Sequence, residues 1–221
     1  MVAGDQTRLD IKVDRGASCF LSTQASTKIY RNPDGLPCSH ELTASIAESA
    51  LFVLAPDPVQ CFAGSCYEQR QRFELASKAS LVLVDWMSSG RCARGERWRF
   101  VRYHSLNELW RDGEMLLLDN LLLDLSDGAL GGRFRTGGFD CLATVVIIGQ
   151  HLAVHAHAIL SWINEQPITP QASLALAASP LREGLLLRLA GKSVEQVGRE
   201  IHRHLAFVDS LLADDPWRRK W

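Results

Sequence analysis

Apolar and polar residues alternate along much of the first half of the chain. Leu9, Ile11 and Val13 alternate with charged residues, which is the pattern of a strand that buries one face. The order of a strand, a short polar turn with an alanine, and a second strand occurs three times. These three segments are residues 7–23, 40–54 and 71–86.

The three segments follow one another at a similar spacing. Their turn alanines, Ala17, Ala50 and Ala79, lie 33 and then 29 residues apart. A unit of two strands cannot bury its apolar face alone, so repeats of this length predict stacked β layers that cover one another, as in a solenoid. The unbroken apolar run Leu81–Val84 fits a strand that is buried on both faces.

The second half of the chain predicts further strands and two helices. Residues 97–103 alternate again, and Arg111–Glu114 contains an Asp-Gly turn between the arms of a hairpin. Apolar residues recur at helical spacing over 150–165, and Ser193 is a candidate N-cap for a final helix over about 193–212. The predicted core face of that helix comprises Val194, Val197, Ile201, Leu205, Val208 and Leu211. We therefore expect one mainly β domain over residues 1–221, with stacked solenoid-like layers and the two helices packed on it in the C-terminal third.

Charge and cysteine usage narrow the classes of partner. The formal net charge of −1 gives no basic field for nucleic acid. The six cysteines include no C-x-x-C pair, which is typical of the reduced thiols of a cytoplasmic protein. No apolar run approaches the roughly 20 residues of a membrane-spanning helix, and no secretory pattern opens the chain. We expect a cytoplasmic protein with neither a nucleic-acid nor a membrane partner.

Motifs for catalysis and nucleotide binding are absent from the sequence. It contains no G-x-S-x-G elbow, no P-loop and no G-x-G-x-x-G. His151 and His155 would share one face of the predicted helix, but Leu152 stands where H-E-x-x-H has its glutamate, and no third ligand lies nearby. Histidines that bind no metal are the simpler interpretation, and a metallohydrolase built on them is the less favoured alternative.

The segment Thr23–Arg31 has an unusual composition for the end of a strand. It reads Thr-Gln-Ala-Ser-Thr-Lys-Ile-Tyr-Arg, with small hydroxylated residues, one lysine, and a tyrosine next to an arginine. This segment resembles the T-Q-A-x-T-K-[IFV]-Y-R signature of the UreD/UreH family of urease accessory proteins.

Further motifs similar to those of this family follow in the same order. Pro56–Phe62 resembles P-[DE]-P-[VT]-x-x-[FY], with Tyr67-x-Gln69 after it, and Gly90–Trp98 resembles G-R-x-A-x-G-E-[RK]-[WF]. Weaker matches are Leu142–Val145 with L-A-T-[VL], Gly184–Arg188 with G-[LV]-x-x-R, and Pro216–Trp221 with the P-x-x-R-K-W ending of eukaryote-like members. Each motif is weak alone, but their shared order makes coincidence improbable. Ala3-Gly4-Asp5 replaces the family's G-G-D, and the β portion that usually precedes it is missing, so the chain resembles an N-terminally short, eukaryote-like member.

The resemblance implies a non-enzymatic maturation factor that helps to insert nickel into apo-urease. Its implied partners are apo-urease and a UreF-like accessory protein, which recruits a UreG-like GTPase. Nickel would pass through an internal passage, so no cofactor would be bound permanently and Ni²⁺ would bind only transiently. A β-solenoid module that binds a different protein is the alternative.

The resemblance also suggests which residues carry this role. Asp5, Asp57 and Glu96 would contact nickel along its path. The residues expected to line or frame the passage are Thr23, Gln24, Thr27, Lys28, Tyr30 and Arg91. For Thr23, Gln24 and Lys28, a hydrogen-bonded network that fixes the register of the layers is the structural alternative. The residues expected at partner interfaces, because aromatic and cationic side chains often anchor them, are Trp217, Arg219 and Trp221, together with Trp98 and Trp110.

Overall fold

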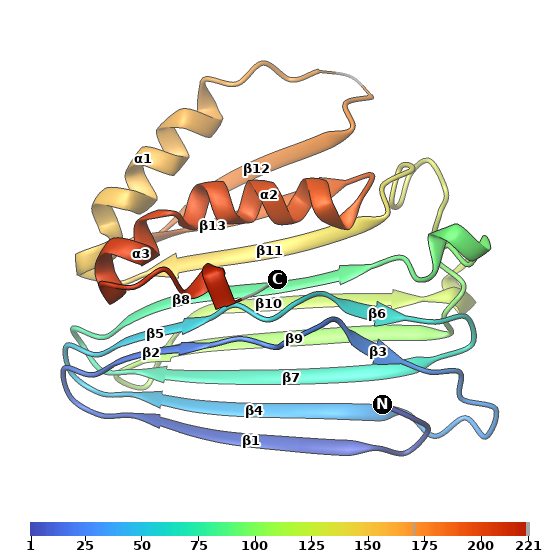
Figure 1. Ribbon diagram of the computed structural model, residues 1–221, viewed down its shortest axis with the longest axis horizontal. Coiled ribbons are helices and arrows are strands. Elements are labelled where there is room, and N and C mark those ends of the chain that lie inside the picture. The colour runs from blue at the N-terminus through green and yellow to red at the C-terminus, as the bar shows by residue number, and fades with distance from the viewer. Residues whose placement is uncertain (170, 220–221) are drawn as a thin grey trace.

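Two β-sheets face each other, and helices cover the outer face of one of them (Figure 1). The computed structural model describes residues 1–169 and 171–219, without the side chain of Arg219. The five-stranded sheet has the order β1-β4-β7-β9-β10. Its strands are β1 (Gln6–Val13), β4 (Cys38–Ile46), β7 (Cys66–Leu75), β9 (Arg102–Arg111) and β10 (Glu114–Asp124).

The second sheet has eight strands, six of them in the order β12-β13-β11-β8-β5-β2. Short strands β3 and β6 pair with each other, and β6 also pairs with β8. The strands of this sheet are β2 (Ser18–Leu21), β3 (Thr27–Ile29), β5 (Leu51–Leu54), β6 (Val59–Cys61), β8 (Ser80–Ser88), β11 (Cys141–Ile148), β12 (Leu174–Leu181) and β13 (Gly184–Gly191).

The repeat in the sequence sets the register between successive layers. Strands β2, β5 and β8 pair in parallel, with Ser18 opposite Leu51 and Leu51 opposite Ser80. These partners lie 33 and 29 residues apart, the same spacings as the turn alanines. The chain therefore winds from one sheet to the other and back, and each turn of chain stacks on the one before it. The predicted mainly β, solenoid-like architecture is confirmed.

The helices lie in the C-terminal part of the chain. A short 3₁₀ helix, Gln150–Leu152, leads into α1 (Ala153–Asn164). Ser193 caps α2 (Val194–Leu205), because its hydroxyl oxygen accepts a hydrogen bond from the backbone N–H of Gln196 at 3.2 Å. The predicted final helix is divided, however: the chain turns at Ala206, and α3 (Phe207–Leu212) follows. The interruption leaves Leu211 at the surface, 37% exposed, so its predicted place in the core is wrong.

The chain before β9 also differs from the prediction. Residues 97–101 do not extend the strand, which begins at Arg102. Trp98 instead has a positive φ of 54° and is buried, and its indole N–H donates to the carbonyl oxygen of Phe139 at 3.0 Å. Trp98 is therefore a core residue and not an exposed interface anchor. The remaining 3₁₀ helices are Cys92–Arg94, Leu125–Asp127 and Pro216–Arg219.

Apolar side chains form three buried clusters. One contains Val145 and Ile201 and lies between the eight-stranded sheet and the helices. The other two lie between the sheets, one around Phe52 and Phe73 and the other around Tyr67 and Phe100. The two clusters between the sheets do not merge, because polar side chains occupy the space that separates them.

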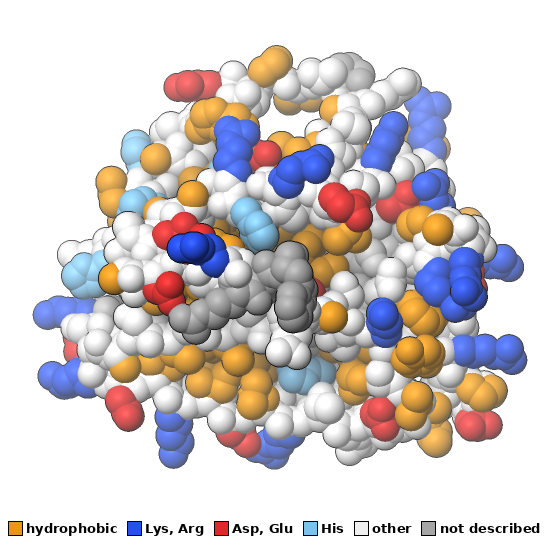
Figure 2. All heavy atoms as spheres, viewed as in Figure 1, with side chains coloured by type: hydrophobic (Ala, Val, Ile, Leu, Met, Phe, Trp, Pro, Cys, Tyr) orange, Lys and Arg blue, Asp and Glu red, His pale blue; other side chains and the backbone are white. Residues whose placement is uncertain are grey.

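Charged side chains of both signs lie on the face of the molecule that Figure 2 shows. They are interspersed there, in keeping with the net charge of −1. Within residues 1–169 and 171–219, no helix is long and apolar enough to cross a membrane.

Candidate functional site

A band of polar side chains crosses the space between the two sheets, and we call it the polar seam. Its members on the five-stranded sheet stand side by side in register on neighbouring strands. They form two adjacent rows: Thr7, His40, Gln69 and Ser105 in the first, and Gln71, Asn107 and Asp119 in the second. The facing row on the eight-stranded sheet comprises Asp85, Thr144 and Arg188. Six of these residues are buried: Gln69, Gln71, Ser105, Asn107, Asp119 and Thr144. Burying so many polar groups in a β core is costly unless they are paired, which makes the polar seam a candidate functional site.

Asp85 lies at the centre of the polar seam. Ser105 Oγ donates to Asp85 Oδ2 at 2.6 Å, and Asn107 Nδ2 donates to the same oxygen at 2.8 Å. Gln69 Nε2 donates to Asp85 Oδ1 at 3.1 Å. Gln69 is itself held by Tyr67, whose hydroxyl donates to Gln69 Oε1 at 3.2 Å. All three contacts to Asp85 come from donors on β7 and β9, so the carboxyl group is presented as an acceptor.

The surroundings of Asp85 act on its pKa in opposite directions. Burial raises the pKa of the Asp85 carboxyl group, although the residue keeps part of its surface exposed, and the charge of Asp119 adds to that rise. The three hydrogen-bond donors stabilise the ionised carboxylate and so lower the pKa, which offsets part of the rise. Burial also lowers the pKa of His40, so that the imidazole is neutral at neutral pH. His40 Nδ1 is 2.8 Å from Thr7 Oγ1.

Two amide oxygens in the second row have no hydrogen-bond partner among residues 1–169 and 171–219. The Oδ1 atom of Asn107 and the Oε1 atom of Gln71 are buried and accept no hydrogen bond from the described residues. Asn107 is only 1% exposed, and the nitrogen of the same amide group binds Asp85. Buried amide oxygens without a partner are unusual in a native core and indicate a place where a water molecule or a cation can be accepted.

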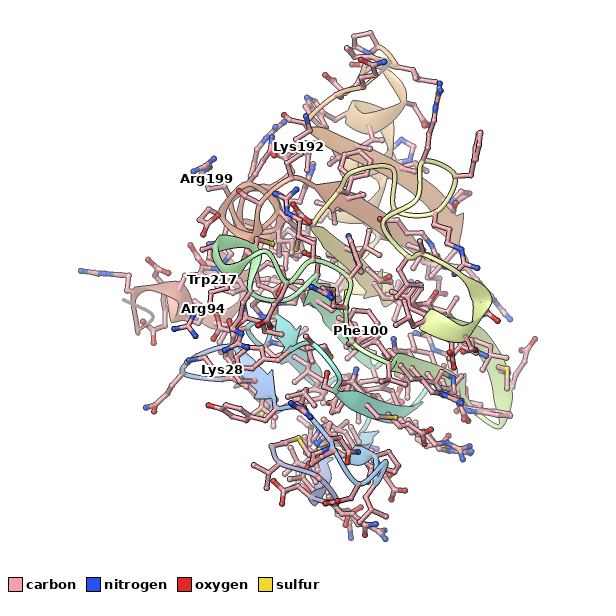
Figure 3. All side chains as sticks on the ribbon, turned by 90° about the vertical axis from the view of Figure 1, so that its right-hand side faces the viewer. Lys28, Arg94, Phe100, Lys192, Arg199 and Trp217 are labelled. Atoms are coloured by element: carbon pink, nitrogen blue, oxygen red, sulfur yellow. The ribbon has the colours of Figure 1, made fainter. Side chains whose placement is uncertain are left out.

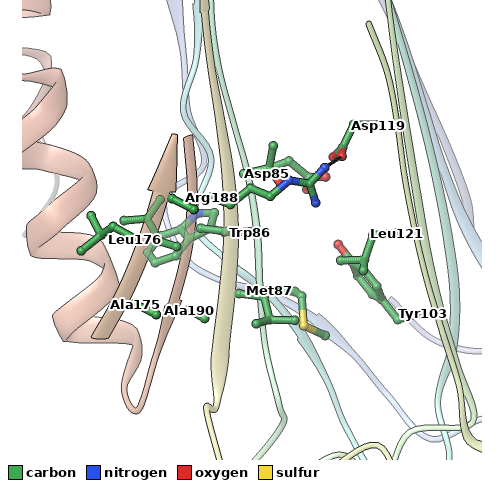
Figure 4. Close-up of a pocket in the computed structure, with 15 residues that line it drawn as sticks. Asp85, Trp86, Met87, Tyr103, Asp119, Leu121, Ala175, Leu176, Arg188 and Ala190 are labelled. Atoms are coloured by element: carbon green, nitrogen blue, oxygen red, sulfur yellow. Dashed lines mark hydrogen bonds and ion pairs between the residues drawn. The ribbon is translucent and has the colours of Figure 1, made fainter. Parts of the chain in front are cut away.

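At the end of the polar seam formed by β10 and β13, an ion pair joins the two sheets. Arg188 extends across the space between them to Asp119 (Figure 4), with Nη2 at 2.6 Å from Oδ1. The Asp119 side chain is 4% exposed, whereas that of Arg188 is 56% exposed. The carboxylate is therefore almost closed off from solvent, while the guanidinium side of the pair is open to it.

Two cavities lie along the polar seam. The smaller, of about 300 Å³, is lined by Asp119, Thr144 and Arg188 among others. The larger, of about 450 Å³, is lined by Thr7, His40, Gln69 and Gln71 together with other residues. Asp85 and Trp86 line both cavities. Asp85 is thus part of the wall of both cavities.

The donors along the polar seam suit a weakly held cation. Carboxylate and amide oxygens are spread along it instead of converging on one point. Among the residues that the structure describes, no three His, Cys, Asp or Glu side chains are grouped to hold a metal ion. The same finding leaves His151 and His155 without a third such ligand, and the His155 ring stacks on Phe207 with the centroids 4.3 Å apart. Scattered oxygen donors can hand on a borderline cation such as Ni²⁺ without trapping it.

Three of the residues expected from the sequence lie at the larger cavity. Thr23, Thr27 and Asp57 are among its lining residues. The backbone N–H of Asp57 donates to Thr23 Oγ1 at 2.7 Å, and that hydroxyl donates to Asp57 Oδ2 at 3.0 Å. These bonds join two turns of the chain 34 residues apart, so Thr23 and Asp57 also fix the register of the layers.

Three other expected residues lie away from both seam cavities. Lys28 is exposed on β3, and its carbonyl oxygen accepts a hydrogen bond from the N-terminal ammonium of Met1 at 2.7 Å. Asp5 is exposed, and its carboxylate accepts the backbone N–H of Val2 at 2.7 Å. Gln24 is exposed beside the C-terminal segment, in a hollow that it shares with Pro216.

Residues of three sequence motifs meet around Phe62. Arg91 and Glu96 form an ion pair, with Nη2 to Oε1 at 2.5 Å and Nε to Oε2 at 2.9 Å. The Arg91 guanidinium lies over the Phe62 ring at 4.3 Å from its centroid, and Tyr30 meets the same ring edge-on at 5.1 Å. The Arg91 side chain beside Glu96 lowers the pKa of that carboxyl group. This cluster closes one end of the layers and does not line either seam cavity.

Trp217 packs against the body of the protein. Its ring meets Phe20 edge-on at 5.2 Å and His202 at 4.6 Å. Figure 3 shows it at the side of the molecule, whereas Phe100 lies inside. Trp221 and the side chain of Arg219 lie outside the described residues. The ring of Trp110 lies beneath the Arg72 guanidinium at 4.8 Å and is half-buried.

The sequence analysis missed Asp85, Asn107, Asp119 and Arg188 as site residues. Each comes from a different strand, so no local motif contains the group. Two signals could have found part of it. Asp85 follows the apolar run Leu81–Val84 in a strand buried on both faces, and Gln69 and Gln71 occupy inward positions of β7 between Tyr67 and Phe73.

Comparison with known proteins assigns the chain to a family. The model of the family described as UreD urease accessory protein matches residues 1–221. The urease accessory protein UreD of Sorangium cellulosum (strain So ce56) is 49% identical over 222 residues, which cover 100% of this chain and 69% of that protein. The urease accessory protein D of Oryza sativa subsp. indica is 30% identical and covers 98% of this chain and 78% of its own length. A fungal relative, urease accessory protein 4 of Cryptococcus neoformans, is 28% identical over 99% of the chain. The chain therefore belongs to the UreD family of urease accessory proteins.

Proposed function

We propose that this protein is a non-enzymatic scaffold and conduit that helps to insert nickel into apo-urease. Nickel is the cargo, and the polar seam is its route between the sheets. The observation that carries the proposal is the pair of cavities that share Asp85 as a lining residue. A β core has no structural need for a carboxyl group between its sheets and unpaired amide oxygens in the same band, and a conduit for a cation does.

The chemistry of the polar seam suits transport better than storage. A closed cage of three or four ligands would hold Ni²⁺ tightly, and a carrier that holds its cargo tightly cannot release it. Oxygen donors spaced along the seam offer successive weak contacts. In this proposal Asp57, at the larger cavity, is an entry or exit ligand, and Thr23 and Thr27 frame that end.

The residues away from both seam cavities take other roles in this proposal. Asp5 and Lys28 are exposed, and Glu96 is engaged by Arg91, so they belong to surfaces that meet other proteins. We propose apo-urease and a UreF-like accessory protein as direct partners, with a UreG-like GTPase recruited through the latter. The half-buried Trp217 on the side that carries α2 is a candidate contact for one of them.

The test is maturation of urease with the natural partners. The chain is co-purified with apo-urease and the UreF-like protein of the same organism, and urease activity and nickel content are measured with and without it. We expect both partners to be captured and nickel-dependent activity to require the chain. The variant Asp85→Asn should still capture the partners but deliver less nickel, and Glu108→Gln, on the outer face of the five-stranded sheet, is the control. Full nickel content with Asp85→Asn would contradict the proposed route.

A further inference from the structure

The ion pair at the β10–β13 end of the polar seam is arranged like an occupied cation site. Asp119 is buried, and the guanidinium that neutralises it arrives from the opposite sheet on a long, half-exposed side chain. A cation that approaches this end from solvent meets Arg188 before it meets the carboxylate. Arg188 and Asp119 line the smaller cavity with Asp85, so the pair and the central carboxyl group share one space.

The two carboxyl groups interact with each other. The negative charge of Asp119 contributes to the raised pKa of Asp85, which means that the two groups are close enough to repel when both are ionised. One positive charge, on Arg188, compensates for them in the described structure. A divalent cation would compensate for both charges at once.

The orphaned amide oxygens supply a second, independent sign of a ligand. Asn107 stands opposite Asp119 in the register of β9 and β10, and its nitrogen binds Asp85. Its Oδ1 atom is buried without a partner among the described residues, as is the Oε1 atom of Gln71 in the same row. Amide oxygens are ligands for divalent cations, and Asn107 is a neighbour of both carboxyl groups, since it binds Asp85 and stands opposite Asp119.

Building on the proposed function, we propose that Asp119 and Asp85 form a divalent-cation site that the Arg188 side chain occupies when no cargo is present. Ni²⁺ enters the polar seam at this end by displacing the guanidinium from Asp119. The displaced side chain moves into solvent, where more than half of it is already exposed. Competition with a tethered cation keeps the site weak, and the returning guanidinium helps the ion to leave.

The test is direct binding of nickel to the isolated chain, with NiCl₂ as the probe and equilibrium dialysis as the measurement. Arg188→Gln should bind Ni²⁺ about tenfold more tightly, because the competing charge is gone and Asp119 is freed. The matched control is Arg182→Gln: Arg182 joins the same hairpin to β10 through an exposed pair with Glu114. The double variant Arg188→Gln with Asp85→Asn should lose the gain. Equal affinity of Arg188→Gln and the wild type, or an equal gain in Arg182→Gln, would overturn the exchange site.

A second measurement covers the case in which Arg188→Gln does not fold because Asp119 is left buried and unpaired. Arg188→Lys keeps a cation but loses the planar fork that holds a carboxylate, so it should bind Ni²⁺ more tightly than Arg182→Gln does. An affinity equal to that control overturns the site. These experiments use the isolated chain, so their failure is distinct from failure in urease maturation. A chain that is needed for maturation but whose Arg188 variants bind nickel unchanged would refute only the exchange site.

Discussion

At the scale of single residues, Asp85 should leave a signature in how stability depends on pH. Burial raises its pKa above the ordinary 3.8, so the folded protein holds this proton more tightly than the unfolded chain does. The free energy of unfolding of the wild type should therefore fall as pH rises from the ordinary pKa to the raised one, by about 1.4 kcal/mol for each unit of the shift. Asp85→Asn cannot titrate and should lack this fall in urea denaturation at a series of pH values.

Glu96→Gln is the control of opposite sign. Arg91 lowers the pKa of Glu96, so the stabilisation from this pair is present above the ordinary carboxyl pKa and is lost as pH falls through the lowered one. This variant should be less stable than the wild type at neutral pH and approach it in acid. A pH profile of Asp85→Asn that runs parallel to that of the wild type would show that Asp85 does not have the raised pKa.

Two glycines of one motif should respond differently to the same substitution. Gly90 has a φ of 116°, and a Cβ there would lie 2.5 Å from the carbonyl oxygen of Glu96 and 2.9 Å from that of Cys61. Gly95 has a φ of 73° with nothing within 4 Å of the added atom. We expect Gly90→Ala to cost about 2–4 kcal/mol and Gly95→Ala about 1 kcal/mol, measured by urea denaturation. Equal costs would mean that the chain relaxes around Gly90.

At the scale of elements, the sequence predicted the layers because their cause is local. Alternation identifies each strand, and the spacing of Ala17, Ala50 and Ala79 equals the register of the parallel pairs. The break at Ala206 was not predictable in this way, because Val208 and Leu211 continue the helical spacing of α2. Packing in three dimensions decides which of them is buried, and Val208 is buried while Leu211 is not.

Because Ile201 of α2 is buried and Leu211 of α3 is exposed, shortening these two side chains should have different effects on stability. Ile201 of α2 lies in the apolar cluster under the helices and is 3% exposed. Ile201→Ala should lower the free energy of unfolding by about 2–4 kcal/mol, the usual cost of a cavity in a core. Leu211→Ala, which the helical pattern alone would rank as equivalent, should cost less than about 1 kcal/mol because Leu211 is partly exposed. Thermal or urea denaturation of both variants measures these changes. Similar losses of unfolding free energy in the two variants would contradict the observed end of α2.

At the scale of the whole molecule, the site was less predictable than the fold. The motifs that identify the family include Thr23 and Asp57 at the larger cavity, but Tyr30, Arg91 and Glu96 gather at the end of the layers. The polar seam takes one or two residues from each of eight strands, and a single polar residue in a strand is common. Only stacking the strands in register turns these scattered residues into a continuous band.

The same band predicts a conflict between stability and transport. Gln71 buries an unpaired oxygen, so the nearly isosteric Gln71→Met should raise the free energy of unfolding by about 1 kcal/mol. It should also lower the nickel content of urease matured with the chain, because the route loses a polar contact.

The control is Phe73→Leu, at the next inward position of β7, where the side chain lies in an apolar cluster. This variant should destabilise the core and leave nickel delivery per folded molecule unchanged. Both quantities are measured on both variants. If Gln71→Met gains stability and delivers nickel normally, the polar seam is not the route. If Gln71→Met is less stable than the wild type, the Gln71 oxygen has a hydrogen-bond partner in solution. The polar seam then lacks the cost of a buried unpaired oxygen, on which the proposed function rests.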